Sequence, residues 1–349
     1  MLRPAYSNDM WDNCGADSAF RLETQLGSGG SGVVYKAWHY RLRKHVAVKV
    51  VKHNVHGDIK TCRNETEALR NLRSAYLPQI LGYQIDGDYG YTVMEFIEGE
   101  SLDKLLERGQ KFTERQAIKW YAQLAVALET IHGRNICHRD IKPANIILTP
   151  DGDVCLIDFT AALIDGKNTR VISRSPGYAS PEQHEYFEKI DNARLKPTRQ
   201  NNLSTSECNA DNAETQLLER GNTTESTVSI SRLRGCCCAE AYESSMFHAA
   251  SGAIIADPGI TAPVTDIDWK LSDIYSLGAT MYHVLMGKRP PGTAGYVGDI
   301  SKLAGFRTDI SEIIKRSMRR QPAERYQSAS ELAEAIILIY TREYRRSFT

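Results

Sequence analysis

The chain has 349 residues, of which 42% are hydrophobic, and its 43 Lys and Arg residues balance its 43 Asp and Glu residues. This length suits two or three small domains or one large two-lobed domain. The zero formal charge argues against nucleic acid as a partner, and no stretch reaches the roughly 18 apolar residues that span a bilayer, so we expect a cytoplasmic protein without a transmembrane segment.

The N-terminal part of the chain is predicted to be rich in strands. After an extension over residues 1–19, which has no apolar core of the signal-peptide kind, residues 20–97 alternate with period two or carry β-branched runs. The expected strands are residues 20–26, 32–39, 45–52 and 89–97. One helical pattern, over residues 65–72, interrupts them.

The chain then turns helical. A capping box, Thr113 to Gln116, is predicted to start a helix over residues 113–132. Two short strands joined by the turn PDGD follow, and apolar periodicity predicts further helices. These elements are expected at residues 145–149 and 154–159 for the strands and 272–287, 309–320 and 329–346 for the helices.

A polar segment breaks this order. Residues 187–265 are rich in Ser, Thr and Asn and show no sustained period, so we predict an inserted, largely mobile loop with at most short helices. Within it, Cys236–Cys238 are adjacent and cannot all bind one metal; a surface accident, lipidation and redox chemistry stay open. The domain order is then a strand lobe over 20–97, a helical lobe over 98–186 and 266–349, and the insert between.

A glycine-rich stretch, GSGGSGVV at residues 27–34, fits the pattern G-x-G-x-x-G-x-V. Glycines let the backbone approach phosphates closely. A dinucleotide-binding turn has the same glycines, but it needs a following helix, and strand-like residues follow here. The predicted nucleotide contacts are Gly27, Ser28, Gly29, Gly30, Ser31 and Gly32.

Lys49, in the strand VAVK, is placed to pair with the α- and β-phosphates of a nucleotide. The helix at 65–72 offers Glu65 as the ion-pair partner of Lys49. Glu67 is the competing candidate, but Glu65 is preferred because Leu69 lies four residues on and shares its face.

The segment HRDIKPAN at residues 138–145 carries the clearest chemistry. Asp140 would accept the proton of an attacking hydroxyl or orient that hydroxyl, and Lys142 would neutralise the transferred phosphate. Asn145, together with Asp158 in the following IDF, would hold Mg²⁺ or Mn²⁺. Phosphoryl transfer needs positioning and charge neutralisation above all, which suits this residue set.

Together these motifs resemble the bacterial, eukaryotic-like (Hanks-type) serine/threonine protein kinases. The resemblance covers residues 20–186 and 266–340 and adds SPGYASPE, SDIYSLG and Arg325 in PAERY. It implies an α+β, bilobal fold: an antiparallel sheet lobe with one main helix, and a mostly helical lobe with a long insert after the activation segment. It also implies transfer of the γ-phosphate of ATP to Ser or Thr hydroxyls of proteins, the chain itself among them.

The resemblance also assigns roles to single residues. Val34, Ala47 and Ile147 would enclose the adenine, Met94 would be the gatekeeper, and Glu95 to Ile97 the hinge. His138 and Phe159 would join Leu69 in an apolar spine between the lobes. Glu182 would pair with Arg325, and Asp273 would hold the backbone of the 138–145 loop. Arg139 would pair with a phosphate on the activation segment, for which Thr169 and Ser173 are the candidates, and Ser175 would bridge Asp140 and Lys142.

Two other functions stay open: a nucleotide-binding pseudokinase that acts as a scaffold, and a small-molecule phosphotransferase. The Pro-Glu of SPGYASPE favours a protein substrate. One departure from the family is Thr160, which stands where the glycine after Asp-Phe is usual. We expect its β-branched side chain to limit switching of this loop and to leave transfer intact.

Overall fold

The structure is a computed structural model that describes part of the chain's residues. They are residues 19–29, 32–52, 66, 69–86, 89–165, 171–173, 175–195, 253–255, 267–290 and 308–346. Glu65 and Thr169 of the predicted site residues lie outside these ranges, as do Gly30 and Ser31. Within them, no helix combines the length and apolar character needed to cross a bilayer.

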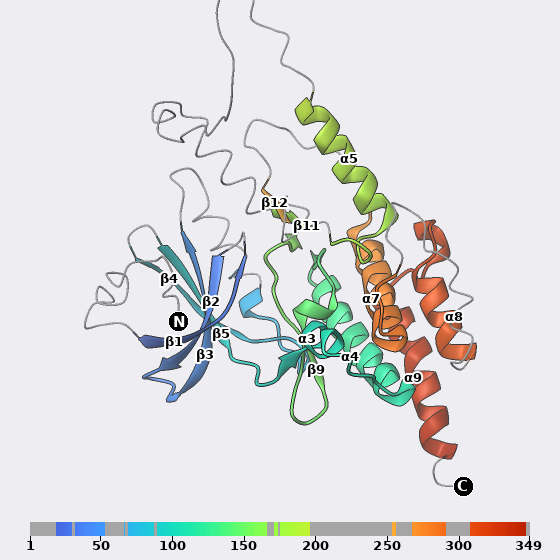
Figure 1. The fold of residues 1–349 in the computed structure, drawn as a ribbon, viewed down its shortest axis with the longest axis horizontal. Coiled ribbons are helices and arrows are strands. Elements are labelled where there is room, and N and C mark those ends of the chain that lie inside the picture. Colours follow the sequence, from blue (N-terminus) through green and yellow to red (C-terminus); the bar gives the residue numbers. More distant parts are fainter. Residues whose placement is uncertain are drawn as a thin grey trace, which may run out of the picture.

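The strand lobe is one antiparallel sheet with the order β1-β2-β3-β5-β4 (Figure 1). Its strands are β1 Phe20–Gly29, β2 Gly32–His39, β3 Lys44–Lys52, β4 Ile80–Asp86 and β5 Tyr89–Glu95. Alternate side chains such as Tyr35, Val48 and Val93 are buried in a small core on one side of the sheet. The period-two pattern of the sequence predicts this arrangement, because successive strand residues face opposite sides.

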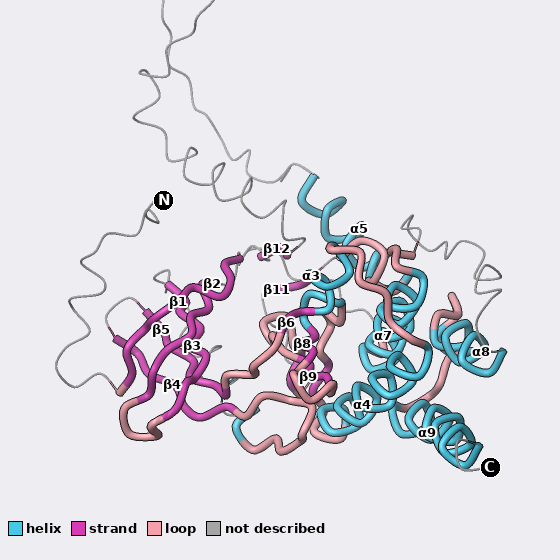
Figure 2. Tube along the Cα trace, turned by 60° about the horizontal axis from the view of Figure 1, so that its bottom comes forward, coloured by secondary structure: helices cyan, strands magenta, loops and turns pink. Residues whose placement is uncertain are grey.

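The helical lobe is built on α4 Glu114–His132, α7 Trp269–Met286, α8 Thr308–Ser317 and α9 Ala329–Arg346. The predicted capping box is confirmed: the Gln116 N–H donates to Thr113 Oγ1 at 3.2 Å, and the Thr113 N–H donates to Gln116 Oε1 at 2.9 Å. Figure 2 shows these helices gathered on the side away from the sheet. The predicted α+β, bilobal architecture is therefore confirmed.

Helix α7 is the central element of this lobe. Nearly every residue of α7 is buried, including the polar Ser272, Asp273, Ser276 and Thr280. A helix with apolar residues all round belongs inside a lobe, and polar side chains there need partners. The helix ends at Gly287, which takes φ 66°, a conformation that favours glycine.

Short pieces of structure lie between the main strands and helices. They are β6 Glu100–Ser101, α3 Leu102–Glu107, β7 Ile136–Cys137, the 3-10 turn η1 Pro143–Asn145, β8 Ile146–Leu148, β9 Val154–Leu156, β10 Leu163–Ile164 and a second 3-10 turn, η3 Pro322–Glu324. Strands β6, β8 and β9 form one small sheet, and β7 pairs with β10. The residues between β7 and β8 are thus fixed at both ends, and they include the 138–145 loop.

The activation segment differs most from expectation. Strand β11 Val171–Ser173 pairs antiparallel with β12 Ala253–Ile255, which comes from the predicted insert. Both strands lie between the sheet and the helices (Figures 1 and 2). Helix α5 Pro181–Leu195 continues past the boundary predicted at residue 187, and Phe187 itself is buried against Cys137 and Leu163.

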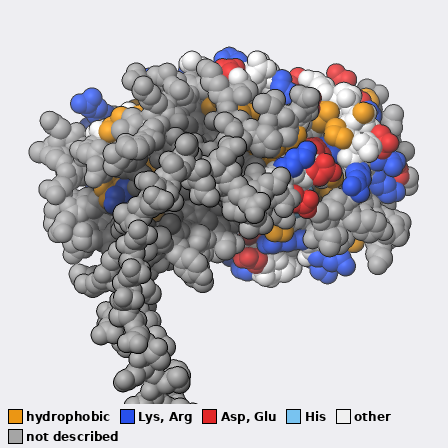
Figure 3. All heavy atoms as spheres, turned by 90° about the horizontal axis from the view of Figure 1, so that it is seen from above, with side chains coloured by type: hydrophobic (Ala, Val, Ile, Leu, Met, Phe, Trp, Pro, Cys, Tyr) orange, Lys and Arg blue, Asp and Glu red, His pale blue; other side chains and the backbone are white. Residues whose placement is uncertain are grey.

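The described surface is of mixed charge where Figure 3 shows it. Lys and Arg side chains alternate with Asp and Glu side chains over the helical lobe in this view (Figure 3). Ion pairs with partly exposed side chains occur in this lobe, for example Lys315–Glu312 at 2.8 Å and Arg316–Glu331 at 2.6 Å. Such exposed pairs add little to stability.

Candidate active site

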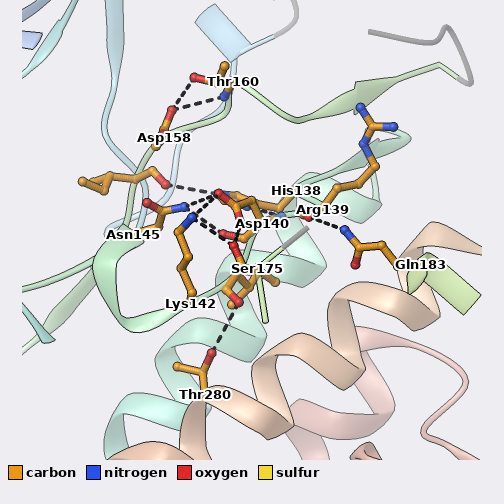
Figure 4. Close-up of polar contacts among 12 residues, drawn as sticks. His138, Arg139, Asp140, Lys142, Asn145, Asp158, Thr160, Ser175, Gln183 and Thr280 are labelled. Carbon is orange, nitrogen blue, oxygen red and sulfur yellow. Dashed lines mark hydrogen bonds and ion pairs between the residues drawn. The ribbon is translucent and has the colours of Figure 1, made fainter. Parts of the chain in front are cut away.

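Four polar side chains meet in and beside the 138–145 loop (Figure 4). Ser175 Oγ donates to Asp140 Oδ1 at 2.8 Å, and Lys142 Nζ lies 3.1 Å from Ser175 Oγ and 2.8 Å from Asp140 Oδ2. Asn145 Nδ2 donates to the backbone oxygen of Asp140 at 2.8 Å and to Oδ2 at 3.1 Å. The structure thus brings Asp140, Lys142, Asn145 and Ser175 together, with the carboxylate at the centre.

Asp273 on α7 fixes the backbone of this loop from below. Its Oδ2 accepts from the His138 N–H at 2.7 Å, and its Oδ1 accepts from the Arg139 N–H at 2.8 Å. His132 Nε2 contacts the same Oδ2 at 2.9 Å. Arg139 takes φ 62°, a left-handed conformation that costs energy in most residues. The hydrogen bonds from a buried carboxylate offset that cost and hold Asp140 in place.

His138 and Phe159 connect the loop to the segment that follows β9. Their ring centroids are 4.8 Å apart, and His138 Nε2 contacts the backbone oxygen of Ile157 at 3.1 Å. Phe159 packs against the large core that includes Leu69. These three residues are therefore parts of one contiguous apolar region that reaches from the helical lobe toward the sheet.

Lys49 on β3 faces Asp158 and Thr160 across the two lobes. Its Nζ lies 3.4 Å from Asp158 Oδ1 and also donates to Thr160 Oγ1. Asp158 takes φ 65°, so it too is in the left-handed region. Loss of water opposes ionisation of Asp158, but the Lys49 charge and the Thr160 hydrogen bonds outweigh this effect and hold the pKa of Asp158 well below its ordinary value. A charged carboxylate with 41% of its side chain exposed is available to a cation.

Asn145 and Asp158 fit the donor set that Mg²⁺ prefers. Mg²⁺ is usually bound by one or two carboxylates or carbonyl oxygens, by water and by substrate phosphates. Since both donors of the Asn145 amide face Asp140, its Oδ1 has no donor among the described residues. The hydrogen-bond and ion-pair partners of Asp158 among the described residues all contact Oδ1, so its Oδ2 has no such partner there. Each residue thus keeps one oxygen for a cation.

The predicted adenine residues lie on neighbouring strands and on the connection between the lobes. Ala47 is opposite Met94 in the β3–β5 pair, and Val34 is opposite Lys49 in the β2–β3 pair. Glu95 turns its carboxylate toward the Gln79 N–H, 3.2 Å away, and donates its own N–H to the Gln79 oxygen at 2.8 Å. Two more of the set, Ile97 and Ile147, are half-buried where the chain passes between the lobes.

The glycine-rich stretch forms the end of β1 and the start of β2. Gly27, Ser28 and Gly29 pair with β2, the last of them opposite Gly32. Gly32 takes φ 123°, and an added Cβ would lie 2.4 Å from the backbone oxygen of Val50. Only glycine fits there, so the turn is kept tight against β3 by sterics.

Glu182 and Arg325 form a buried pair that ties α5 to the end of the helical lobe. Arg325 Nη1 and Nη2 donate to Glu182 Oε1 and Oε2 at 2.6 and 2.8 Å. The arginine is fully buried, whereas the glutamate side chain is 15% exposed. This two-bond geometry is the strongest form of the Arg–carboxylate contact.

The structure describes only some of the predicted regulatory residues. The Arg139 side chain is buried, donates from Nε to the Ala161 oxygen at 2.6 Å and lies over the Trp269 ring at 5.1 Å. Ser173 ends β11, and its side chain is not described. Thr169 lies outside the described residues, as does Glu65, so neither the phosphate-pairing role of Arg139 nor the Lys49–Glu65 pair has a geometry here.

Two positions that the sequence analysis did not single out also hold the loop. Gln183 Nε2 donates to the Arg139 oxygen at 3.0 Å, and Thr280 Oγ1 lies 3.5 Å from the Ile141 oxygen (Figure 4). A signal existed for Thr280, because it lies seven residues after Asp273 on α7 and so shares its face. Gln183 carries no such signal, since its partner is 44 residues away in the sequence.

Comparison with known proteins points to one family. Residues 20–192 match the protein kinase domain family. The chain is 36% identical over 171 residues to a probable serine/threonine-protein kinase of Clostridium acetobutylicum, a match that covers 47% of this chain and 26% of that protein. It is 34% identical over 185 residues to serine/threonine-protein kinase pkn2 of Myxococcus xanthus, covering 49% and 22%. It is 33% identical over 176 residues to serine/threonine-protein kinase PknA of Mycobacterium tuberculosis, covering 47% and 41%. The matched region is therefore less than half the length of each of these relatives.

Proposed function

Because this chain carries a protein kinase domain of the bacterial serine/threonine type, we propose that it transfers the γ-phosphate of ATP to Ser or Thr hydroxyls of proteins, itself among them. The observation that carries this proposal is the cluster around Asp140. Its carboxylate lies 2.8 Å from the Lys142 ammonium and 2.8 Å from the Ser175 hydroxyl. Phosphoryl transfer to a hydroxyl requires an anion that orients the hydroxyl and accepts its proton. It also requires a cation nearby that neutralises the charge on the phosphoryl oxygens.

In this mechanism, Asp140 orients the substrate hydroxyl and accepts its proton as the bond to phosphorus forms. Lys142 neutralises negative charge on the phosphoryl oxygens. Ser175 contacts both Asp140 and Lys142 and fixes the positions of their side chains. Lys49, on the sheet lobe, would pair with the α- and β-phosphates of the nucleotide. A bound Mg²⁺ or Mn²⁺, held by Asn145 and Asp158, would supply charge neutralisation between the phosphates.

The sheet lobe is proposed to bind the nucleotide. Val34, Ala47 and Met94 lie on adjoining strands, and Ile147 lies on the helical side of the same connection. Apolar side chains on both lobes suit a flat adenine ring, and the tight Gly32 turn suits close approach of phosphates. A reaction that consumes ATP is proposed to take place in the cytoplasm, where the buried thiols of Cys137 and Cys155 stay reduced.

The activation segment is proposed to bind the protein substrate and to regulate activity. The Glu182–Arg325 pair anchors the start of α5, and the family resemblance implies that the docking surface for a protein substrate begins in this region. The β11–β12 pairing connects the predicted insert with the activation segment, which supports the idea that the insert influences substrate choice or inhibits the enzyme. Thr169 remains the proposed autophosphorylation site, tested by phosphate incorporation into Thr169→Ala.

The experiment that tests the proposed function compares Asp140→Asn with the wild-type chain. We expect the wild-type chain to incorporate phosphate from ATP into itself and a generic protein substrate. The variant keeps the shape of Asp140 but not its charge, so its rate should fall by about 10²-fold or more, while nucleotide binding is retained. Equal incorporation by both proteins would refute the role of Asp140.

The same experiment separates the two rival functions. A pseudokinase would bind the nucleotide with no transfer by either protein. A small-molecule phosphotransferase would transfer phosphate to a metabolite and to no protein, itself included. The presence of Lys49, Asp140, Asn145 and Asp158 supports an active enzyme over a pseudokinase, and the Pro-Glu of SPGYASPE supports a protein substrate over a small molecule.

A further inference from the structure

Thr160 makes contacts that a glycine at this position cannot make. Its Oγ1 donates to Asp158 Oδ1 at 2.5 Å and accepts from Lys49 Nζ. Its backbone N–H donates to the same Oδ1 at 3.3 Å. Lys49 belongs to the sheet lobe, whereas Asp158 and Thr160 follow β9, so the hydroxyl lies where the two lobes meet. Figure 4 shows Thr160 beside Asp158.

The donor and acceptor roles in this contact are determined by chemistry. A lysine ammonium only donates and an ionised carboxylate only accepts, whereas a hydroxyl donates once and accepts through its lone pairs. The Thr160 hydrogen must therefore point to Asp158, and a lone pair must face Lys49. Among side chains of this size, serine can replace threonine in that position, and valine and glycine cannot.

The backbone at Thr160 is compatible with a β-branched residue. Thr160 is not among the described residues with positive φ, whereas Asp158 two residues earlier takes φ 65°. The left-handed torsion of this turn is thus at Asp158. Because Thr160 does not need a left-handed conformation in this state, the absence of glycine causes no backbone strain there. Position 160 is free to carry a functional side chain.

We propose that Thr160 is a positioning residue that sets the metal-binding carboxylate of Asp158 and the ammonium of Lys49 for Mg²⁺-nucleotide binding. The three donors, Lys49 Nζ, Thr160 Oγ1 and the Thr160 N–H, all contact Oδ1 of Asp158. They restrict rotation of the carboxylate and leave Oδ2, which has no hydrogen-bond partner among the described residues, for the cation. Residues that orient a metal ligand commonly contribute about 10–100-fold to metal affinity or activity.

This inference rests on the proposed function and makes it more specific. In the mechanism above, Asp158 holds the cation and Lys49 faces the phosphates. Thr160 fixes these two groups relative to each other before the nucleotide arrives. It is a different role from a hinge that only slows loop switching, because it depends on the hydroxyl and not on the bulk of the side chain.

The test measures binding of a non-hydrolysable ATP analogue to the full chain by calorimetry, with Mg²⁺ and with EDTA. Thr160→Ser, Thr160→Val and Thr160→Gly are compared with the wild-type chain. Thr130→Val is the matched control, since Thr130 Oγ1 donates only to the Val126 oxygen within α4. Folding of each variant is checked by thermal melting, and Thr160→Ala replaces Thr160→Val if the latter does not fold.

We expect the valine and glycine variants to lose about 10–100-fold in affinity for the Mg²⁺-analogue, with a much smaller change in EDTA. The serine variant and the Thr130 control should stay near the wild-type affinity. The Mg²⁺ concentration for half-maximal phosphate transfer should rise in the same two variants.

The inference is overturned if Thr160→Val binds the Mg²⁺-analogue as the wild-type chain does, or if Thr160→Ser is as impaired as Thr160→Val. A gain in affinity for Thr160→Gly would also overturn it. Failure of the proposed function looks different: the wild-type chain then binds the Mg²⁺-analogue without transferring phosphate, and the binding data still decide the role of Thr160. A wild-type chain that does not bind the analogue at all refutes both.

Discussion

The buried Glu182–Arg325 pair predicts a large loss of stability in Glu182→Gln. The substitution keeps the shape of the side chain and removes its charge. Arg325 is then left as an uncompensated cation with no exposed surface. Removing one partner of a buried ion pair typically costs about 3–5 kcal/mol, so the effect belongs to the largest class of single substitutions.

The structure places the expected cost at the lower end of that range. Arg325 keeps three backbone acceptors in the variant, namely the oxygens of Arg319, Leu271 and Arg320 at 2.8, 3.0 and 3.0 Å. It also keeps the Tyr275 ring, 5.0 Å from the guanidinium carbon. These contacts partly satisfy the charge, and we therefore expect a loss of about 3 kcal/mol. For a lobe of this size, that corresponds to roughly 6–12 °C in Tm.

Urea unfolding followed by tryptophan fluorescence measures this change, because Trp120 and Trp269 are both buried in the helical lobe. Glu312→Gln is the control: it removes the exposed pair with Lys315, whose side chains are 59% and 34% accessible, and should change stability by less than about 0.5 kcal/mol. A loss below about 1 kcal/mol in Glu182→Gln would show that the pair behaves like a surface contact, and the reasoning from burial would fail.

Three further predictions concern other parts of the molecule. Gly32→Ala should raise the KM for ATP, because a Cβ there would lie 2.4 Å from the Val50 oxygen; an unchanged KM in a steady-state assay would exclude the tight turn. Burial, with the nearby Arg289 charge, lowers the pKa of His283 below its ordinary 6.5, so the unfolded chain takes up a proton first and stability should fall as pH drops below about 6.5. Melting curves from pH 7.5 to 5.5 should show a weaker fall in His283→Gln, and parallel curves would contradict this. Ile254→Pro should disrupt the β11–β12 pairing, since proline removes a backbone donor, and hydrogen exchange of residues 171–173 should then become faster, whereas Ile254→Val should leave it unchanged.

The sequence predicts the chemistry of the site better than its support. Asp140, Lys142 and Asn145 lie within six consecutive residues, so their proximity follows from local chain geometry, and the structure brings them together. Lys49 and Asp158 lie 109 residues apart. Their proximity was expected only through the resemblance to a family, and no spacing rule would have supplied it.

The parts that were missed depend on contacts between distant segments. Helix α5 extends to Leu195, but beyond Phe187 it carries few apolar residues, so its pattern was interpreted as part of a polar loop. The packing of the Arg139 guanidinium over the Trp269 ring joins positions 130 residues apart, and no local pattern in the sequence indicates this contact. The polar composition of residues 187–265 predicts a loop, but composition carries no information about pairing with a distant segment. Strand β12, within these residues, pairs with β11.

The segment between α5 and α7 separates two parts of the fold that nevertheless form one unit. Ser180 Oγ contacts Ser272 Oγ at 2.8 Å, Gln183 reaches Arg139, and Glu182 reaches Arg325. Closing a long connection instead of a short one costs only about 0.6 kcal/mol for each doubling of length. An eightfold longer connection would thus cost about 2 kcal/mol, less than the loss expected from the single substitution Glu182→Gln. Folding of the helical lobe therefore does not require a short connection between α5 and α7. The length and sequence of this connection can instead be selected for its effect on the activation segment, which β12 contacts through β11.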